Sequence, residues 1–286
     1  VIVRAGPLGA MPAWCTPGTP SFISTHCAGV NLTLTDGGGN FQARWAGQYH
    51  VTTAGGHWLA YCLRDDLGHP QDSSDGVVSS LIDQGGSPVS LHEEYAYVLW
   101  KWGDTNDDNT AAAVWMLGHY YAQDTTGSGN VLISGLAATT NPTVNLLAAS
   151  MHAEAQANKG PWTVAVSAVA PANWTGTSTS GSLHVTGAGG GNIAGVSVSL
   201  SALGGSVSPS TVVTDASGNA SFTFSSSGGQ VTVSASTVGP GYPTILDPPG
   251  LADQLVGTAG STQSFTGNAS ASPTKYAVGD FVWIDA

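Results

Sequence analysis

Positively charged side chains are scarce in this sequence. Its 286 residues include six Lys and Arg against 18 Asp and Glu, which gives a formal net charge of -12. Binding to nucleic acid or to an anionic lipid surface depends on clusters of Lys and Arg that neutralise phosphate groups. We therefore expect neither nucleic acid nor a lipid surface as a partner.

Long hydrophobic runs are also missing. No stretch approaches the roughly 18 apolar residues that a membrane-spanning helix needs, so we expect any membrane anchor outside this chain. The sequence begins with Val, and Gly6–Met11 resembles what a cleaved purification tag leaves behind. We therefore expect residues 1–11 to lie outside the fold. Few Lys and many Thr, Ser, Gly and Asn are typical of extracellular bacterial proteins, which makes a secreted or cell-wall-attached location the working assumption.

The sequence contains only three cysteines, which is an odd number. Cys15 and Cys27 enclose a segment rich in Pro, Thr and Ser that a disulfide could close as a small loop. We predict that bond, with Cys62 remaining reduced. A remaining thiol in a secreted protein is buried and inert, linked to another chain, or reactive, and all three options stay open at this point.

Familiar sets of catalytic and metal-binding residues are missing too. The eight His show no paired ligand spacing, and nothing in the sequence places His57 or His119 beside Cys62 as a base. Glu93 and Glu94 are adjacent on a predicted helix and point apart, unlike the carboxylate pair of a glycosidase. We predict no enzyme activity and no cofactor. Four further carboxylates could hold a hard cation but are more simply solvated: Asp65, Asp66, Asp72 and Asp75.

An acidic stretch between two predicted helices invites a comparison with calcium-binding loops. Asp104, Asn106 and Asp108 occupy the first, third and fifth positions of such a loop. Asn109 stands where the loop needs Gly, and Trp115 stands where it needs Glu, which excludes an EF-hand. We interpret the stretch as helix capping and keep the first three residues as the candidate metal ligands.

What the sequence does contain is two kinds of periodicity. Residues 12–160 alternate strand and helix patterns, which predicts an α+β head domain, a β-sandwich or barrel with inserted helices. The expected strands are Val30–Thr35, Phe41–Trp45, Gln48–Val51, His57–Leu63 and Val131–Leu136. The expected helices are Pro88–Gly103, Asn109–Asp124 and one that begins at Asn141–Pro142 and ends at Lys159–Pro161.

From Trp162 the period changes from 3.6 to 2. Short alternating strands separated by Gly-rich turns predict an all-β immunoglobulin-like sandwich over residues 161–272, with residues 237–272 forming a long loop and a closing strand. The expected strands are Trp162–Val166, Ser182–Val185, Val196–Leu200, Ala220–Phe224 and Val231–Ala235. Residues 273–286 look like the start of a further β repeat.

Two short motifs in the head resemble a known family. Tyr61–Asp65 at a strand end, followed by Thr110–Trp115 at a helix start, resembles the thioester domains of Gram-positive surface adhesins. The resemblance covers residues 28–160. In that family the Cys sulfur is joined to a Gln side-chain acyl group with loss of ammonia. A nucleophile on a target opens the bond and stays covalently attached.

The sequence departs from that pattern at one decisive position. The family's helix motif reads Thr-Gln-x-Ala, then Ile or Val, then Trp, which places its Gln at Ala111. Alanine has no acyl group to give Cys62. A deliberate replacement of Gln by Ala is the favoured explanation, ahead of natural loss and of a misleading resemblance. Among the other glutamines, Gln84 in a Gly-rich loop is a better substitute than Gln71 or Gln123.

Two further resemblances concern the rest of the chain. Asn192–Leu200 with Thr214–Phe222 looks like bacterial immunoglobulin-like repeats of stalk proteins. Tyr276–Asp285 is similar to the opening of the B-type repeats of staphylococcal surface proteins. The resulting prediction is a cell-surface adhesin that binds a host or environmental ligand through its head, covalently where residue 111 is Gln. A secreted enzyme with an immunoglobulin-like accessory domain is the competing interpretation, and a structural spacer is the third.

Overall fold

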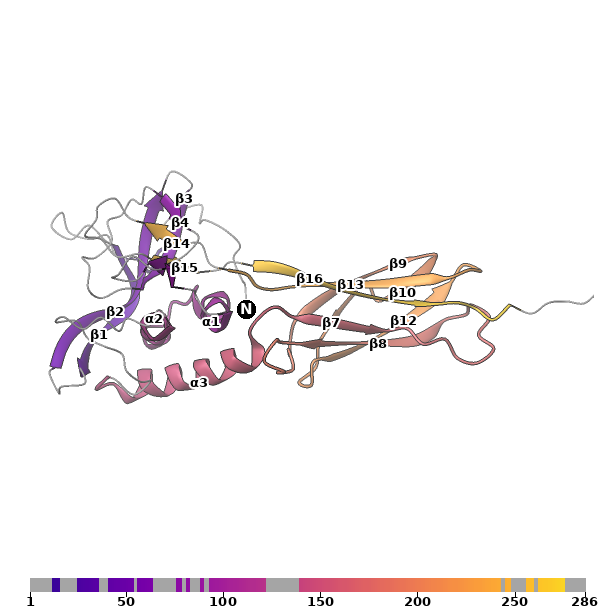
Figure 1. Ribbon diagram of the computed structural model, residues 1–286, viewed down its shortest axis with the longest axis horizontal. Coiled ribbons are helices and arrows are strands. Elements are labelled where there is room, and N and C mark those ends of the chain that lie inside the picture. Colours follow the sequence, from indigo (N-terminus) through magenta and orange to yellow (C-terminus); the bar gives the residue numbers. More distant parts are fainter. Residues whose placement is uncertain are drawn as a thin grey trace, which may run out of the picture. The chain divides into compact units, whose positions relative to one another are not determined.

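The computed structural model divides into two compact units (Figure 1). The first consists of Val1–Pro161, Gly187–Gly191 and Gly239–Gln263, and the second of Trp162–Thr186, Asn192–Val238 and Ser264–Ala286. The first change from one unit to the other falls between residues 161 and 162. Residues 239–263 were expected in the sandwich but cluster with the first unit. The residues described are 12–15, 25–35, 41–53, 56–63, 76–78, 81–82, 88–89, 93–121, 139–242, 245–247, 256–259 and 262–275.

The first unit contains a six-stranded sheet with the strand order β1-β2-β3-β15-β14-β4. The predicted hairpin is present, because Thr35 pairs with Phe41 across the Gly-rich segment. The sheet's strands are β1 (Thr25–Thr35), β2 (Phe41–Thr53), β3 (Gly56–Cys62), β4 (Gly76–Val78), β14 (Ile245–Asp247) and β15 (Val256–Thr258).

Strands β14 and β15 come from the far end of the sequence. Val256 pairs with Cys62, and Ile245 pairs with both Gly257 and Val78. Strand β15 therefore gives β3 a neighbour on the side away from β2. Without this returning segment, the backbone groups along that side of β3 would have no sheet partner.

The described residues of the first unit include three helices: α1 (Glu93–Trp102), α2 (Asp108–Tyr121) and α3 (Pro142–Asn158). The predicted helix at Pro88 begins too early, because Pro88–Val89 forms the short strand β6, paired with β5 (Leu81–Ile82). A proline lacks the backbone N–H, and a β-branched valine favours extended geometry. Helix α3 begins as predicted, with the Asn141 side chain accepting bonds from the backbone N–H groups of Thr143 and Val144.

The second unit contains two four-stranded sheets, in the orders β10-β12-β8-β7 and β11-β9-β13-β16. Alternate residues of the strands are buried, as in β12, where Ala220, Phe222 and Phe224 point inward. This is the pattern of a sandwich core; the immunoglobulin-like identity stays a prediction. The strands are β7 (Thr163–Ser167), β8 (Thr179–Thr186), β9 (Ser197–Leu203), β10 (Gly205–Ser208), β11 (Thr211–Val213), β12 (Asn219–Ser226), β13 (Val231–Pro240) and β16 (Thr262–Ala271).

Candidate functional site

Cys62 is the last residue of β3, the strand that lies between β2 and β15 in the sheet. It is 1% exposed and keeps a reduced thiol. Helix α2 packs against β3, and Ala111 lies in the first turn of that helix with no exposed surface. The structure therefore carries the two motif positions on a strand and a helix that pack together.

The residue before Cys62 takes part in a buried polar network. Gln48 donates through Nε2 to the Gly103 carbonyl oxygen at 2.8 Å and to the Tyr61 hydroxyl at 3.3 Å. The Tyr61 hydroxyl donates to the same carbonyl at 3.0 Å, and Trp14 Nε1 donates to Gln48 Oε1 at 3.2 Å. The network fixes β2, β3 and the end of α1 to one another. Burial raises the pKa of Tyr61 far above its ordinary value.

Tyr95 of α1 is a buried residue near Tyr61 and Cys62. Its hydroxyl is buried and has no hydrogen-bond partner in the described part of the chain. A Cβ added to Gly118 of α2 would come within 2.5 Å of that hydroxyl, so the two helices approach closely here. Burial raises the pKa of Tyr95 well above its ordinary value, and the neighbouring Tyr61 and Cys62 raise it further. Tyr95 is therefore close to both Cys62 and α2.

Ala111 is held in place by the start of α2. Its backbone N–H donates to the Asp107 carbonyl at 2.9 Å, the first hydrogen bond of a regular helix. The next four residues of the motif, Ala112 to Trp115, are also buried. A methyl group at position 111 has no electrophilic carbon, so the site as it stands can hold a thiol but cannot acylate it.

The acidic stretch before α2 acts through its side chains as helix-capping and strand-anchoring groups. Asp107 Oδ1 accepts from the Thr110 N–H at 2.8 Å, and hydrogen bonds from Thr110 lower the pKa of the Asp107 carboxyl. Asp108 Oδ1 accepts from the Gly29 N–H of β1 at 3.0 Å. Among the described residues, no group of three or more His, Cys, Asp or Glu side chains is arranged to hold a metal ion. The metal role of Asp104, Asn106 and Asp108 stays a prediction.

A disulfide joins Cys15 to Cys27 and so ties the amino-terminal segment to β1. The two cysteines form a small apolar cluster with Leu59 of β3, and Trp14 and Ala259 pack against it. The cluster lies three residues before Cys62 along β3. It therefore helps to fix the strand that carries the thiol.

The structure also contains a pocket that the sequence did not indicate. Its volume is about 260 Å³, and all of its lining residues belong to the first unit. The lining comes from four separate segments, so no local motif could reveal it. The lining residues are Glu93, Ala96, Gly160, Pro161, Pro240, Gly241, Tyr242 and Gln263.

Several residues singled out from the sequence lie outside the described residues. They are Asp65, Asp66, Asp72, Asp75, Gln71, Gln84 and Gln123, together with the segments Val131–Leu136 and Tyr276–Asp285. Among the helices that are described, none combines the length and the apolar character needed to cross a membrane.

The chain shows little similarity to known proteins. No protein-family model matches the sequence, and no curated protein matches it. A solved structure described as the D00-D0 domain of Intimin is similar over 39% of this chain, with 21% sequence identity and a TM-score of 0.24. The match covers 46% of that structure's chain, so less than half of its length is represented. A TM-score this low supports no conclusion about fold or function.

Proposed function

We propose that this chain is the adhesive part of a secreted or wall-attached surface protein. In the natural form, a thioester would join Cys62 to a Gln at position 111. The observation that carries the proposal is the placement of a buried, reduced Cys62 on β3, against the helix that carries the Thr110–Trp115 motif. With Ala111 the chain retains the scaffold of such a site without its acyl group.

The chemistry of the complete site balances without a cofactor. The Cys62 sulfur would attack the side-chain amide carbon of Gln at 111, forming a C–S bond and releasing ammonia. An amine on a ligand would then attack the same carbon, forming an amide and returning the thiol of Cys62. Burial of Cys62 supports this role, because a thioester protected from water is hydrolysed slowly.

The test is the variant Ala111→Gln. We expect its intact mass to be lower than the calculated mass by one molecule of ammonia. Incubation with methylamine should then add one methylamine to the protein, because the amine opens the thioester. Both mass changes should disappear in Ala111→Gln/Cys62→Ala, since the sulfur that forms the bond is gone.

A matched control is Ala112→Gln, which places the same side chain at the next buried position of α2. This variant should show no loss of ammonia and should lose about 1–3 kcal/mol of unfolding free energy through overpacking. If Ala111→Gln folds but keeps its full calculated mass, the thioester proposal is wrong.

A further inference from the structure

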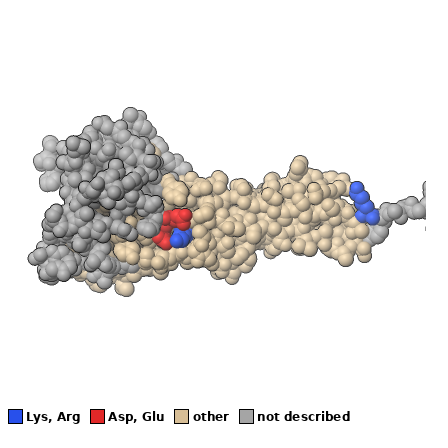
Figure 2. All heavy atoms as spheres, in the orientation of Figure 1, with Lys and Arg blue, Asp and Glu red and all other residues tan. Residues whose placement is uncertain are grey.

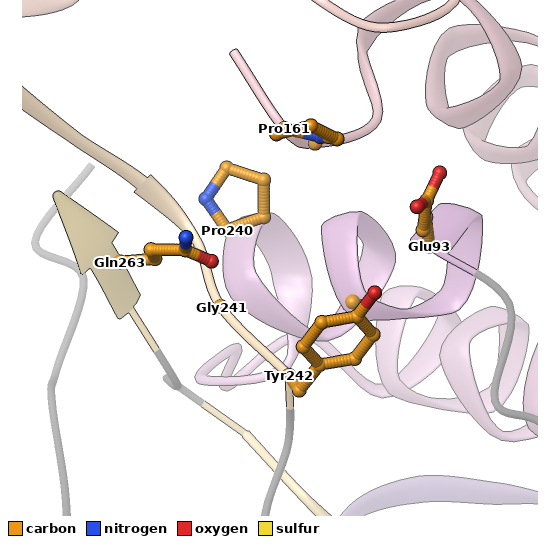
Figure 3. A pocket seen from close by; sticks show the side chains of 8 residues that line it. Glu93, Pro161, Pro240, Gly241, Tyr242 and Gln263 are labelled. Carbon is orange, nitrogen blue, oxygen red and sulfur yellow. The ribbon is translucent and has the colours of Figure 1, made fainter. Parts of the chain in front are cut away.

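The carboxylates on the described helices of the first unit have two kinds of partner. Three of the four interact with lysine side chains. They are Glu93, Glu94 and Glu154. Figure 2 shows acidic and basic side chains next to each other on one face of the chain, and Glu93 also lines the pocket in Figure 3. The fourth carboxylate, that of Asp108, accepts instead from the main chain of the sheet.

Asp108 ties the first turn of α2 to β1. Its Oδ1 accepts from the Gly29 N–H at 3.0 Å. The pairing of β1 with β2 shifts between His26 and Gly29, and a bulge of this kind interrupts the hydrogen bonds of the ladder. The strands are closely packed at this point, because a Cβ on Gly29 would lie 2.6 Å from the Ala46 carbonyl oxygen. The helix is therefore anchored at a tightly packed point of the sheet.

This anchor point lies in line with Cys62 across the sheet. Gly29 pairs with Gly47, and the next strand pair, β2 with β3, includes Tyr49 opposite Ala60. Two residues beyond that pair, on the same register, are Gly47 and Cys62. Residues directly opposite each other in neighbouring strands share a face of the sheet. Gly29 and Cys62 are thus two strands apart, about 10 Å, and on the same face.

Residue 111 lies on the same side of α2 as Asp108, since positions three apart on an α-helix are neighbours. Ala111 has no exposed surface. Farther along α2, a Cβ on Gly118 would lie 3.2 Å from Leu63 Cδ2, in the residue that follows Cys62. The helix is therefore fixed at its start on β1 and again beside the end of β3.

We propose that Asp108 is a positioning residue for the bond between Cys62 and residue 111. By holding the start of α2 on Gly29, it sets the separation of the Cys62 sulfur and the side chain at position 111. The inference rests on the proposed function. Bond formation there joins sulfur to the amide carbon of Gln, breaks the C–N bond and sends the thiol proton away with the ammonia. A displacement of the helix start by about 1 Å is enough to slow such a step.

The first test follows the loss of ammonia by intact mass in Ala111→Gln after dilution from denaturant. Adding Asp108→Ala should slow the loss by about tenfold or more. Asp108→Asn keeps the Oδ1 acceptor and should restore the rate. Asp107→Ala is the matched control, because it removes the adjacent carboxylate, which accepts from Thr110 of its own helix. This control should lower the denaturation midpoint but keep the rate close to that of Ala111→Gln alone.

The second test needs no thioester and uses the chain with Ala111. Cys62 is its free thiol and is 1% exposed, so iodoacetamide should modify it only when the surrounding structure opens. Asp108→Ala should speed alkylation by about tenfold, as the loss of a hydrogen bond to a charged group predicts. Asp108→Asn and Asp107→Ala should stay close to the parent rate. Near-ultraviolet circular dichroism verifies that each variant is folded.

If Asp108→Ala does not fold, Asp108→Glu decides the question. It keeps the carboxylate but lengthens the link to Gly29 by one methylene, so it should slow the loss of ammonia and speed alkylation. Unchanged rates in both tests, or equal effects of the Asp107 and Asp108 substitutions, would overturn the positioning role.

Failure of the inference differs from failure of the proposed function. If Ala111→Gln keeps its ammonia while Asp108→Ala still speeds alkylation of Cys62, the thioester proposal is wrong and the placement of α2 by Asp108 stands. If Ala111→Gln loses ammonia and the added Asp108→Ala loses it equally fast, the thioester stands and the positioning role is wrong.

Discussion

At the scale of single residues, Gln48 links three groups in the polar network beside Cys62. Its side chain is completely buried and satisfied by Trp14, Tyr61 and Gly103. A buried amide is stabilising only while its partners are present, since each unpaired polar group costs free energy in the interior. The environment of Cys62 therefore depends on a residue in another strand.

The variant Gln48→Met tests this dependence. It keeps most of the side-chain volume but leaves Trp14 Nε1 without its acceptor, so we expect a loss of about 1–3 kcal/mol in unfolding free energy. Urea denaturation measures the change. Gln156→Met, on the exposed side of α3, is the matched control and should stay within about 0.5 kcal/mol of the parent. Equal effects of the two substitutions would contradict a structural role for the network.

At the scale of elements, helices α1 and α2 meet where Gly118 faces Tyr95. Gly to Ala inside a helix normally stabilises by roughly 0.5–1 kcal/mol. Here the added Cβ would lie 2.5 Å from the Tyr95 hydroxyl and 3.0 Å from its Cζ atom. A glycine in the middle of α2 is therefore explained by packing and not by flexibility.

Gly118→Ala should accordingly destabilise the chain by about 1–3 kcal/mol. Tyr95→Phe should be neutral or stabilising, because it removes a buried hydroxyl that has no partner in the described part of the chain. In the double variant the cost of the Gly118→Ala substitution should shrink, which a double-mutant cycle of denaturation free energies would measure. Strict additivity of the two changes would argue against the contact.

The elements that could be predicted from the sequence are those with local signals. The hairpin of β1 and β2, the start of α3 and the alternating strands of the second unit each follow from periodicity, turn residues or a cap. Strands β14 and β15 could not be predicted in this way. Each has three residues, and each is defined by partners at the other end of the sequence, such as Cys62 for Val256. Short strands of this kind exist only through long-range pairing.

Some parts of the candidate site could likewise be predicted from local sequence, and other parts could not. The motif around Cys62 and Ala111 is local, and so its two positions were visible in the sequence. Capping of α2 by Asp107 required knowing where the helix begins. The Glu93 pocket was not visible at all, because its walls come from four segments that only the fold brings together.

At the scale of the whole molecule, buried tyrosines set the response to alkaline pH. Burial raises the pKa of Tyr61, Tyr95, Tyr97 and Tyr121, and a hydrogen bond to Glu94 raises the pKa of Lys159. A group whose pKa is higher in the folded state makes its full contribution to the unfolding free energy at pH values below its pKa in the unfolded chain, which is about 10 for these groups. That contribution is lost as pH rises, because the unfolded chain then binds fewer protons than the folded one.

Unfolding free energy should therefore fall between about pH 9 and 11, by up to about 1.4 kcal/mol per pH unit for each buried tyrosine. Urea denaturation across this range measures the slope, which Tyr95→Phe should make shallower. Tyrosinate absorbance of the buried set should appear only as the chain unfolds. Full ionisation with an intact near-ultraviolet circular dichroism spectrum would contradict this expectation.

The pairing of β15 with β3 also sets the order in which this protein can be completed. Cys62 is synthesised early, yet its strand neighbour Val256 emerges only after the residues of the second unit up to Val238 have been made. During synthesis or export, the side of β3 that pairs with β15 therefore stays without its partner while strands β7 to β13 of the second unit are made. Both units therefore depend on the same late stretch of the chain: residues 256–258 complete the order of strands around β3, and residues 262–271 then supply the edge strand of the second unit.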